Sequence, residues 1–331
     1  MKKTFPVVVV RPKAALQLGG RRPDDYSQPG GLPRSDLLFA AVCHAWALLG
    51  LNEPLHLLEE NLDCKGFWLS SAFPFVLTGN EPTYLWPRPM IPAPARASDQ
   101  EDTTRQALVK KTKKIKWVDN HYLQDALAGN PPNLATEAYK NQLRGEFLAP
   151  TKPYQTDEIT RASVPIQEDE DTKPFNVGRL WFAENSGYYF LLYVESEKWM
   201  MWLQAAFDLL RHEGLGTDRN LGYGFFEYEL KELKFDLPEP SGYWLALGLY
   251  LPPNADELRP TLTNSHSRWS LVKRGGWITT EGWPEAAADG LLCRGSRANL
   301  APDAGFIPIQ HPVWRSGQTL FLPVHLNLDQ P

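Results

Sequence analysis

The residues best suited to bind a ligand lie in the segment from His212 to Phe226, which reads HEGLGTDRNLGYGFF. Four glycines fall within eleven residues of this segment, and Asp218 stands beside Arg219. Glycines let a backbone turn tightly and approach a ligand closely, while an arginine supplies charge and a planar stacking face. The segment therefore predicts either a ligand-binding loop or a tight structural turn.

Two familiar nucleotide-binding loops do not fit this segment. A Walker loop needs Lys-Ser/Thr after its last glycine, whereas Tyr223 and Phe225 flank Gly224. A dinucleotide-binding loop needs a glycine where Arg219 stands, and it runs from a strand into a helix. Residues 214–224, which we call the glycine loop, run in the opposite direction.

The elements on either side of the glycine loop can be predicted from side-chain periodicity. Residues 196–213 predict a helix with one apolar stripe, made of Trp199, Leu203, Ala206, Phe207 and Leu210. Gly214 is predicted to cap this helix, and residues 225–230 alternate as a strand does. A loop at a helix C-terminus meets the negative end of the helix dipole, so backbone amides and Arg219 would have to hold any anion.

The remaining elements of the first two thirds of the chain complete an α+β pattern. Residues 5–11 predict a strand, and residues 35–50 predict a buried helix with Ser35 as N-cap and Gly50 at its end. Residues 66–72 predict a short strand, and residues 179–195 predict a hairpin about Asn185–Gly187. The order becomes strand, helix, strand, strand, helix, strand once an insertion at about 74–177 is removed.

The element patterns predict two domains of the same fold class. It is the split βαβ, or ferredoxin-like, order of RNA-recognition motifs, and it spans residues 1–237. Residues 238–331 contain strand patterns and little helical pattern, so we expect a degenerate second ferredoxin-like domain there.

Composition narrows the possible partners. A net charge of −5 provides no global attraction to nucleic acid or anionic membrane. The apolar run near the N-terminus stops at Arg11, and no segment approaches a membrane span, so we expect a cytoplasmic protein. The three cysteines are far apart, which predicts neither a disulfide framework nor a zinc site. We expect no metal, cofactor, membrane partner or small-molecule substrate.

A basic run in the insertion has two possible interpretations. Trp117 follows six basic residues, which are Arg105, Lys110, Lys111, Lys113, Lys114 and Lys116. Such a run is typical of a solvated helix face, whereas the tryptophan favours contact with RNA.

Five segments in sequence order carry a resemblance to a known family. They are GLPRSDLLFAAVCHAWALLG, GLGTDRNLGYGFF, YWLALGLYLPP, LVKRGGWI and HPVWRSGQTLFLPV. Together they resemble the group 5 RAMP subunit of type III-A CRISPR effector complexes, the fourth subunit of the Csm complex. The resemblance implies a non-catalytic subunit that grips the 5′ handle of the CRISPR RNA. It also implies docking to the large polymerase-nuclease subunit and to the backbone RAMP subunits.

The same resemblance implies which residues bind RNA. Asp218 would position Arg219 or bind a nucleotide edge. Gln17 and Asn220 stand where relatives often carry histidine and Ser or Thr, respectively. The implied RNA-binding residues are Gly19, Ser35, Asp36, Arg161, Gly214, Gly216, Asp218, Arg219, Asn220, Gly222, Gly224, Lys273 and Arg274.

Two other functions compete with RNA binding. A metal-independent endoribonuclease acting on CRISPR repeats would use His44 or His212 as general acid or base. His44 has apolar neighbours in the sequence, which favours a core histidine. A protein scaffold would instead use the tryptophans of the second domain, Trp269, Trp277, Trp283 and Trp314, as interface residues.

Overall fold

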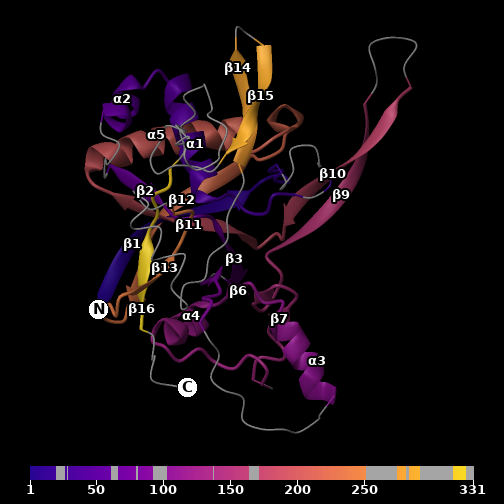
Figure 1. The fold of residues 1–331 in the computed structure, drawn as a ribbon, viewed down its shortest axis with the longest axis vertical. Helices are drawn as coiled ribbons and strands as arrows, with labels where there is room; N and C mark the ends of the chain where they lie inside the picture. Colours follow the sequence, from indigo (N-terminus) through magenta and orange to yellow (C-terminus); the bar gives the residue numbers. More distant parts are fainter. Residues whose placement is uncertain are drawn as a thin grey trace.

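A computed structural model shows a mixed α/β protein built around one antiparallel sheet (Figure 1). Residues are described over the ranges 1–19, 27, 29–60, 66–79, 81–91, 103–136, 138–163, 171–250, 274–280, 283–290 and 316–325.

The central sheet runs in the order β12-β1-β11-β3-β4. These strands are β12 (Phe226–Asp236), β1 (Lys2–Pro12), β11 (Ser186–Val194), β3 (Phe73–Thr78) and β4 (Glu81–Tyr84), and β2 (Phe67–Leu69) also pairs with β11. All pairings are antiparallel. The predicted order of strand, helix, strand, strand, helix, strand is present in β1, α1, the β2/β3 segment, β11, α5 and β12.

Strand β1 is buried on both faces. Val7, Val8, Val9 and Val10 are all buried, and successive side chains of a strand point to opposite faces. Val8 and Val10 belong to one apolar core, whereas Val7 and Val9 belong to another. The β-branched run therefore requires a covering layer on each side of the sheet.

Three helices cover the first face of the sheet. They are α1 (Ser35–Leu48), α2 (Asn52–Glu60) and α5 (Glu197–Glu213). The five residues predicted to form the apolar stripe of α5 are all buried, which confirms that helix and its contact face. Trp46 of α1 is fully buried, and its Nε1 donates to Trp202 O at 2.7 Å.

The insertion and the C-terminal strands cover the second face together. The insertion contributes α4 (Asn120–Leu127), with Leu123 and Leu127 fully buried beside Phe5 and Val7 of β1. The strands β13 (Tyr243–Ala246) and β16 (Phe321–Val324) pair with each other and add Leu322 to the same core. The described residues of both regions therefore share a core with the first sheet.

The remaining described elements are short, apart from one ribbon. The insertion also contains α3 (Thr103–Thr112) and the small sheet β5 (Trp86–Pro87), β6 (Trp117–Val118), β8 (Phe147–Leu148) and β7 (Leu143–Arg144). A separate pair consists of β14 (Arg274–Thr280) and β15 (Trp283–Gly290). The long ribbon of β9 (Tyr154–Ser163) and β10 (Lys173–Phe182) extends away from the central sheet (Figure 1).

The predicted hairpin over residues 179–195 is wrong. Both strands exist, but β10 pairs with β9 and β11 pairs with β1, β2 and β3. The turn before β11 is present, since Ser186 N donates to Ala183 O at 3.0 Å. A tight turn fixes a change of direction, while the long-range partners decide which strands pair.

Two predictions about α1 are also wrong. Arg34 occupies the N-cap position and Ser35 begins the helix, with no side-chain capping bond. The helix is not buried all round, because Leu48 is 58% exposed and His44 is exposed as well. The helix therefore contains more apolar residues than its core-facing side uses, and some of them, such as Leu48, face outward.

No helix within the described residues is long and apolar enough to cross a membrane.

The shared second core predicts that the insertion stabilises the whole fold. Leu123→Ala should lower the free energy of unfolding by about 2–5 kcal/mol, because it removes a fully buried side chain. Met201→Ala, at a side chain that is largely exposed on α5, should change it by less than about 0.5 kcal/mol. Urea unfolding measures both, and equal midpoints for the two variants would contradict this role for the insertion.

Candidate RNA interface

The glycine loop joins the C-terminus of α5 to β12, as predicted. Gly214 caps the helix with φ 81° and ψ 161°, and its N–H donates to Leu210 O at 2.8 Å. Residues with a side chain rarely adopt this backbone conformation, so the cap requires glycine. A short 3₁₀ turn, η1 (Arg219–Leu221), lies within the loop.

Backbone hydrogen bonds fasten the glycine loop to the segment that follows β1. Gly224 N donates to Ala15 O at 2.9 Å, and Thr217 N donates to Gln17 O at 2.9 Å. The loop also closes on itself, because Leu215 N donates to Gly224 O at 3.0 Å. These bonds hold the loop rigidly beside the N-terminal strand.

Two glycines of the loop are required by these close approaches. A Cβ atom at Gly216 would lie 2.2 Å from Gln17 O, and one at Gly224 would lie 2.1 Å from Leu215 O. Both residues also have positive φ, at 101° and 76°. Gly222 has φ 87° but no atom within 4 Å of its Cβ position, so its backbone faces open space.

The ribbon and Gly30 complete the described surroundings of the loop. Leu16 and Leu180 exchange backbone hydrogen bonds of 2.9 and 2.8 Å, which tie β10 to the residues beside the loop. Gly30 N donates to Leu18 O at 3.0 Å. Gly19 itself is exposed, with no atom within 4 Å of its Cβ position, and therefore lies at the edge of this assembly.

Asp218 binds Arg161 of the ribbon. It adopts a left-handed conformation with φ 58° and ψ 26°, and its carboxylate forms an ion pair with the Arg161 guanidinium. The Arg161 guanidinium also lies 5.7 Å from the ring centroid of Tyr223. The expectation that Asp218 positions Arg219 is therefore replaced by an ion pair with an arginine 57 residues away.

A second arginine meets the same tyrosine. Arg179 Nη1 donates to Tyr223 Oη at 2.9 Å, and the Arg179 guanidinium binds both carboxylate oxygens of Asp157, at 2.9 and 2.7 Å. The hydrogen bond from Arg179 keeps the pKa of Asp157 below its ordinary value. Asp157 is thus ionised at neutral pH and keeps the guanidinium in place.

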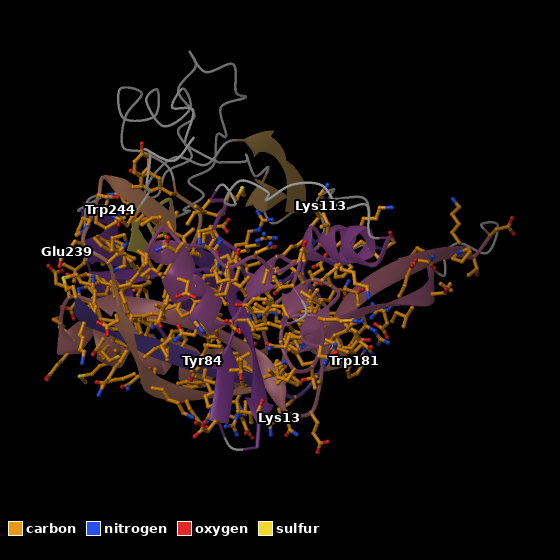
Figure 2. All side chains as sticks on the ribbon, turned by 90° about the horizontal axis from the view of Figure 1, so that it is seen from below. Lys13, Tyr84, Lys113, Trp181, Glu239 and Trp244 are labelled. Atoms are coloured by element: carbon orange, nitrogen blue, oxygen red, sulfur yellow. The ribbon has the colours of Figure 1, made fainter. Side chains whose placement is uncertain are left out.

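An exposed indole extends this cluster. Trp181 Nε1 donates to Asp157 Oδ2 at 3.0 Å, and the Arg179 guanidinium lies 5.1 Å from the Trp181 ring. The side chain is 39% exposed, and Figure 2 labels it at the base of the ribbon. An aromatic side chain held in this way can stack against a planar ligand group.

Arg219 has no partner within the described residues. Its side chain is half-buried and forms neither a hydrogen bond nor an ion pair there. The peptide N–H groups of Arg219 and Asn220 likewise have no acceptor in the described part of the chain. The loop therefore presents one free cation and two free donors beside two neutralised arginines.

The sequence did not single out Arg179, Asp157, Tyr223 or Trp181 as site residues. Tyr223 could have been suspected, because it lies within the glycine loop. Arg179 and Asp157 are 22 residues apart, and only the β9–β10 register places them opposite each other. No local pattern marks such a pair.

Ser35 and Asp36 do not lie on this surface. Each is 1% exposed, and Ser35 Oγ accepts a hydrogen bond from Leu249 N at 2.9 Å. Arg274 begins β14, and Lys273 lies outside the described residues.

The two histidines considered for catalysis are both exposed. His44 was expected in the core, but it lies on the outer side of α1. His212 Nε2 accepts a hydrogen bond from Arg211 Nε at 3.1 Å. Within the described residues, neither histidine has a carboxylate that could orient it as an acid or base.

Comparison with known proteins supports the resemblance. No family model matches the chain. A curated protein of Thermococcus onnurineus (strain NA1), named CRISPR system Cms protein Csm4, is 27% identical over 304 residues, covering 89% of this chain and 92% of that protein. The chain is therefore a relative of Csm4. The protein of the same name from Methanocaldococcus jannaschii is 29% identical over 127 residues, covering 35% of this chain and 32% of its own.

Solved structures of Csm4-containing complexes share the fold. A chain in the Csm1-Csm4 cassette in complex with AMPPNP gives a TM-score of 0.55 at 21% identity, covering 98% of this chain and 99% of that one. A chain in the Csm3-Csm4 subcomplex of the type III-A CRISPR-Cas interference complex gives 0.50 at 19% identity, covering 97% and 100%. The α/β architecture is thus that of these chains. The resemblance seen in the sequence is supported by the similarity to Csm4.

The close approaches predict unequal effects of adding one methyl group at two loop glycines. Gly222→Ala should cost about 1–2 kcal/mol of stability, because an L-residue there must adopt positive φ in open space. Gly224→Ala should cost clearly more, since its Cβ would also collide with the Leu215 backbone. Free energies of unfolding measure the difference, and equal destabilisation by the two changes would show that the loop is not clamped as described.

Proposed function

We propose that this chain is a non-catalytic RNA-binding subunit of a type III-A CRISPR effector complex in the cytoplasm, and that it holds the 5′ handle of the CRISPR RNA. The observation that carries the proposal is the position of Arg219. Within the described residues it is an unpaired cation, and it lies on the loop whose Tyr223 contacts Arg161 and Arg179. Trp181 lies next to Arg179. The similarity to Csm4 over 89% of the chain supports the choice of complex.

The glycine loop suits the sugar-phosphate backbone of a short RNA strand. The free N–H groups of Arg219 and Asn220 can donate to phosphate or ribose oxygens, and Arg219 adds charge. Gly222 has no neighbour within 4 Å of its Cβ position, so a strand could approach the main chain there without meeting a side chain. Such interactions would position the RNA strand independently of its base sequence.

Aromatic and guanidinium planes beside the loop suit unstacked bases. Single-stranded RNA is commonly held by stacking its bases on aromatic rings or arginine planes. Trp181 is exposed, and Asp157 fixes it together with Arg179. The Trp181 ring can then stack on a base while the glycine loop binds the sugar-phosphate backbone of the same strand.

The architecture and the partners follow the same proposal. The sheet order β12-β1-β11-β3, with α1 and α5 on one face, supports our assignment of residues 1–237 to a ferredoxin-like domain. We assign residues 238–331 to a degenerate second domain of this kind. The Csm1-Csm4 and Csm3-Csm4 structures support docking of this chain to a large polymerase-nuclease subunit and to a backbone RAMP subunit.

Removing the unpaired arginine should weaken handle binding. The probe is an oligonucleotide with the 5′ sequence of the RNA that copurifies with the chain from its native host. Arg219→Ala should lower its affinity and flatten the plot of log affinity against log salt by about 0.7 if Arg219 neutralises one phosphate. Arg144→Ala is the matched control, because the Arg144 side chain is also half-buried and without a partner in the described residues.

The outcome for the two arginine variants decides the site. Equal affinities and salt slopes for Arg219→Ala and the unchanged chain would reject RNA binding at the glycine loop. An equal decrease in affinity in both variants would indicate a general effect of removing charge.

An endoribonuclease acting on CRISPR repeats is the alternative, because His44 and His212 are accessible. On the present proposal, a labelled repeat RNA incubated with the chain in EDTA stays intact. Specific cleavage that disappears in His44→Ala or His212→Ala would establish the enzyme instead. Denaturing gel electrophoresis of the labelled RNA distinguishes the two results.

A further inference from the structure

The end of α3 carries a group of exposed lysines that the proposed function does not use. Lys110, Lys111, Lys113 and Lys114 are all exposed, and we call them the lysine segment. Their ammonium groups form no hydrogen bond or ion pair with any described residue. The next lysine, Lys116, differs because it binds Glu146.

Buried neighbours fix the direction of the lysine segment. Leu108, Thr112 and Ile115 alternate with the lysines and are buried. Arg88 holds the backbone from the other side, with its N–H donating to Lys116 O at 2.8 Å and its Nη1 donating to Thr112 O at 2.9 Å. The lysines therefore project from an anchored backbone.

Stability of the helix does not account for this charge pattern. No acidic residue occurs between Thr103 and Lys116, and lysines three and four positions apart repel one another. Lys110 and Lys111 gain from the dipole at the end of α3, but Lys113 and Lys114 follow the helix. Opposite charge from a bound partner would remove the repulsion.

We propose that the lysine segment binds the phosphate backbone of a nucleic acid strand, independently of base sequence. Lysine acts as a point charge toward phosphate, whereas base recognition uses planar or aromatic groups. Trp117 does not provide such a group, because it is half-buried and packs against Phe73 with ring centroids 6.1 Å apart. The interaction is therefore electrostatic.

A nucleic acid fits this surface better than a protein partner does. A protein interface usually has an apolar centre within a polar rim. Here the apolar side chains Leu108, Ile115 and Val118 are turned into the fold, and the exposed positions among residues 107–116 are lysines except for Ala107. A positively charged surface that exposes little apolar area is suited to binding a polyanion such as a nucleic acid.

The lysine segment is separate from the glycine loop. In Figure 1, α3 lies away from the β9–β10 ribbon, and Figure 2 labels Lys113 on the upper side of the molecule and Trp181 on the lower side. A strand bound here is thus a second nucleic acid interaction. It does not depend on handle binding by Arg219.

Salt-dependent binding of poly(U) tests this surface in the full chain. A variant with Lys110, Lys111, Lys113 and Lys114 changed to Gln should bind more weakly. Its plot of log affinity against log salt should flatten by about 0.7 for each phosphate that the variant no longer neutralises. The matched control changes four other exposed lysines to Gln, namely Lys2, Lys3, Lys152 and Lys234, and should keep the original slope.

Further measurements separate the possible outcomes. The lysine-segment variant should still bind the short handle oligonucleotide. Loss of poly(U) binding with handle binding retained therefore reports on the lysine segment and not on the glycine loop. Poly(dT) in place of poly(U) shows whether RNA or DNA is preferred. The proposal is overturned if both lysine variants have the same salt slope. Competition provides a second test, in which polyglutamate and poly(dT) are each added to displace bound poly(U). The proposal is also overturned if polyglutamate displaces poly(U) as effectively as poly(dT) does, because that result would indicate an acidic protein partner.

Discussion

The fastening of the glycine loop to the residues after β1 is the interaction on which the candidate site depends. Gly216 lies against the carbonyl of Gln17, and Gly224 lies against Leu215, at distances that leave no room for a side chain. This packing places the C-terminus of α5, the start of β12 and the end of β1 next to one another. The ribbon joins there through Leu16 and Leu180, so Arg161 and Arg179 meet Tyr223 of the loop.

Burial of β1 on both faces explains why such different segments cover the sheet. The valine run supplies apolar side chains to two cores, and each core must be closed by another layer. The helices close one face, while α4 and the β13–β16 pair close the other. The insertion is therefore a structural part of the fold.

Local charge matters more here than the net charge of −5. Carboxylates neutralise and orient two arginines at the ribbon, through Asp157 and Asp218. Arg219 and the lysine segment keep free charge on two separate surfaces within the described residues. An acidic protein can in this way direct nucleic acid to chosen places without attracting it everywhere.

The sequence by itself determined the features that depend on neighbours along the chain. The apolar stripe of α5, the cap at Gly214 and the strand β1 follow from local spacing and composition. The resemblance to the RAMP subunit rests on five short segments of the sequence. Only the tertiary structure decided which strands pair, that His44 is exposed, that Ser35 is buried, and that Asp218 binds Arg161. Strand register and burial depend on residues tens to hundreds of positions apart, so no local pattern can fix them.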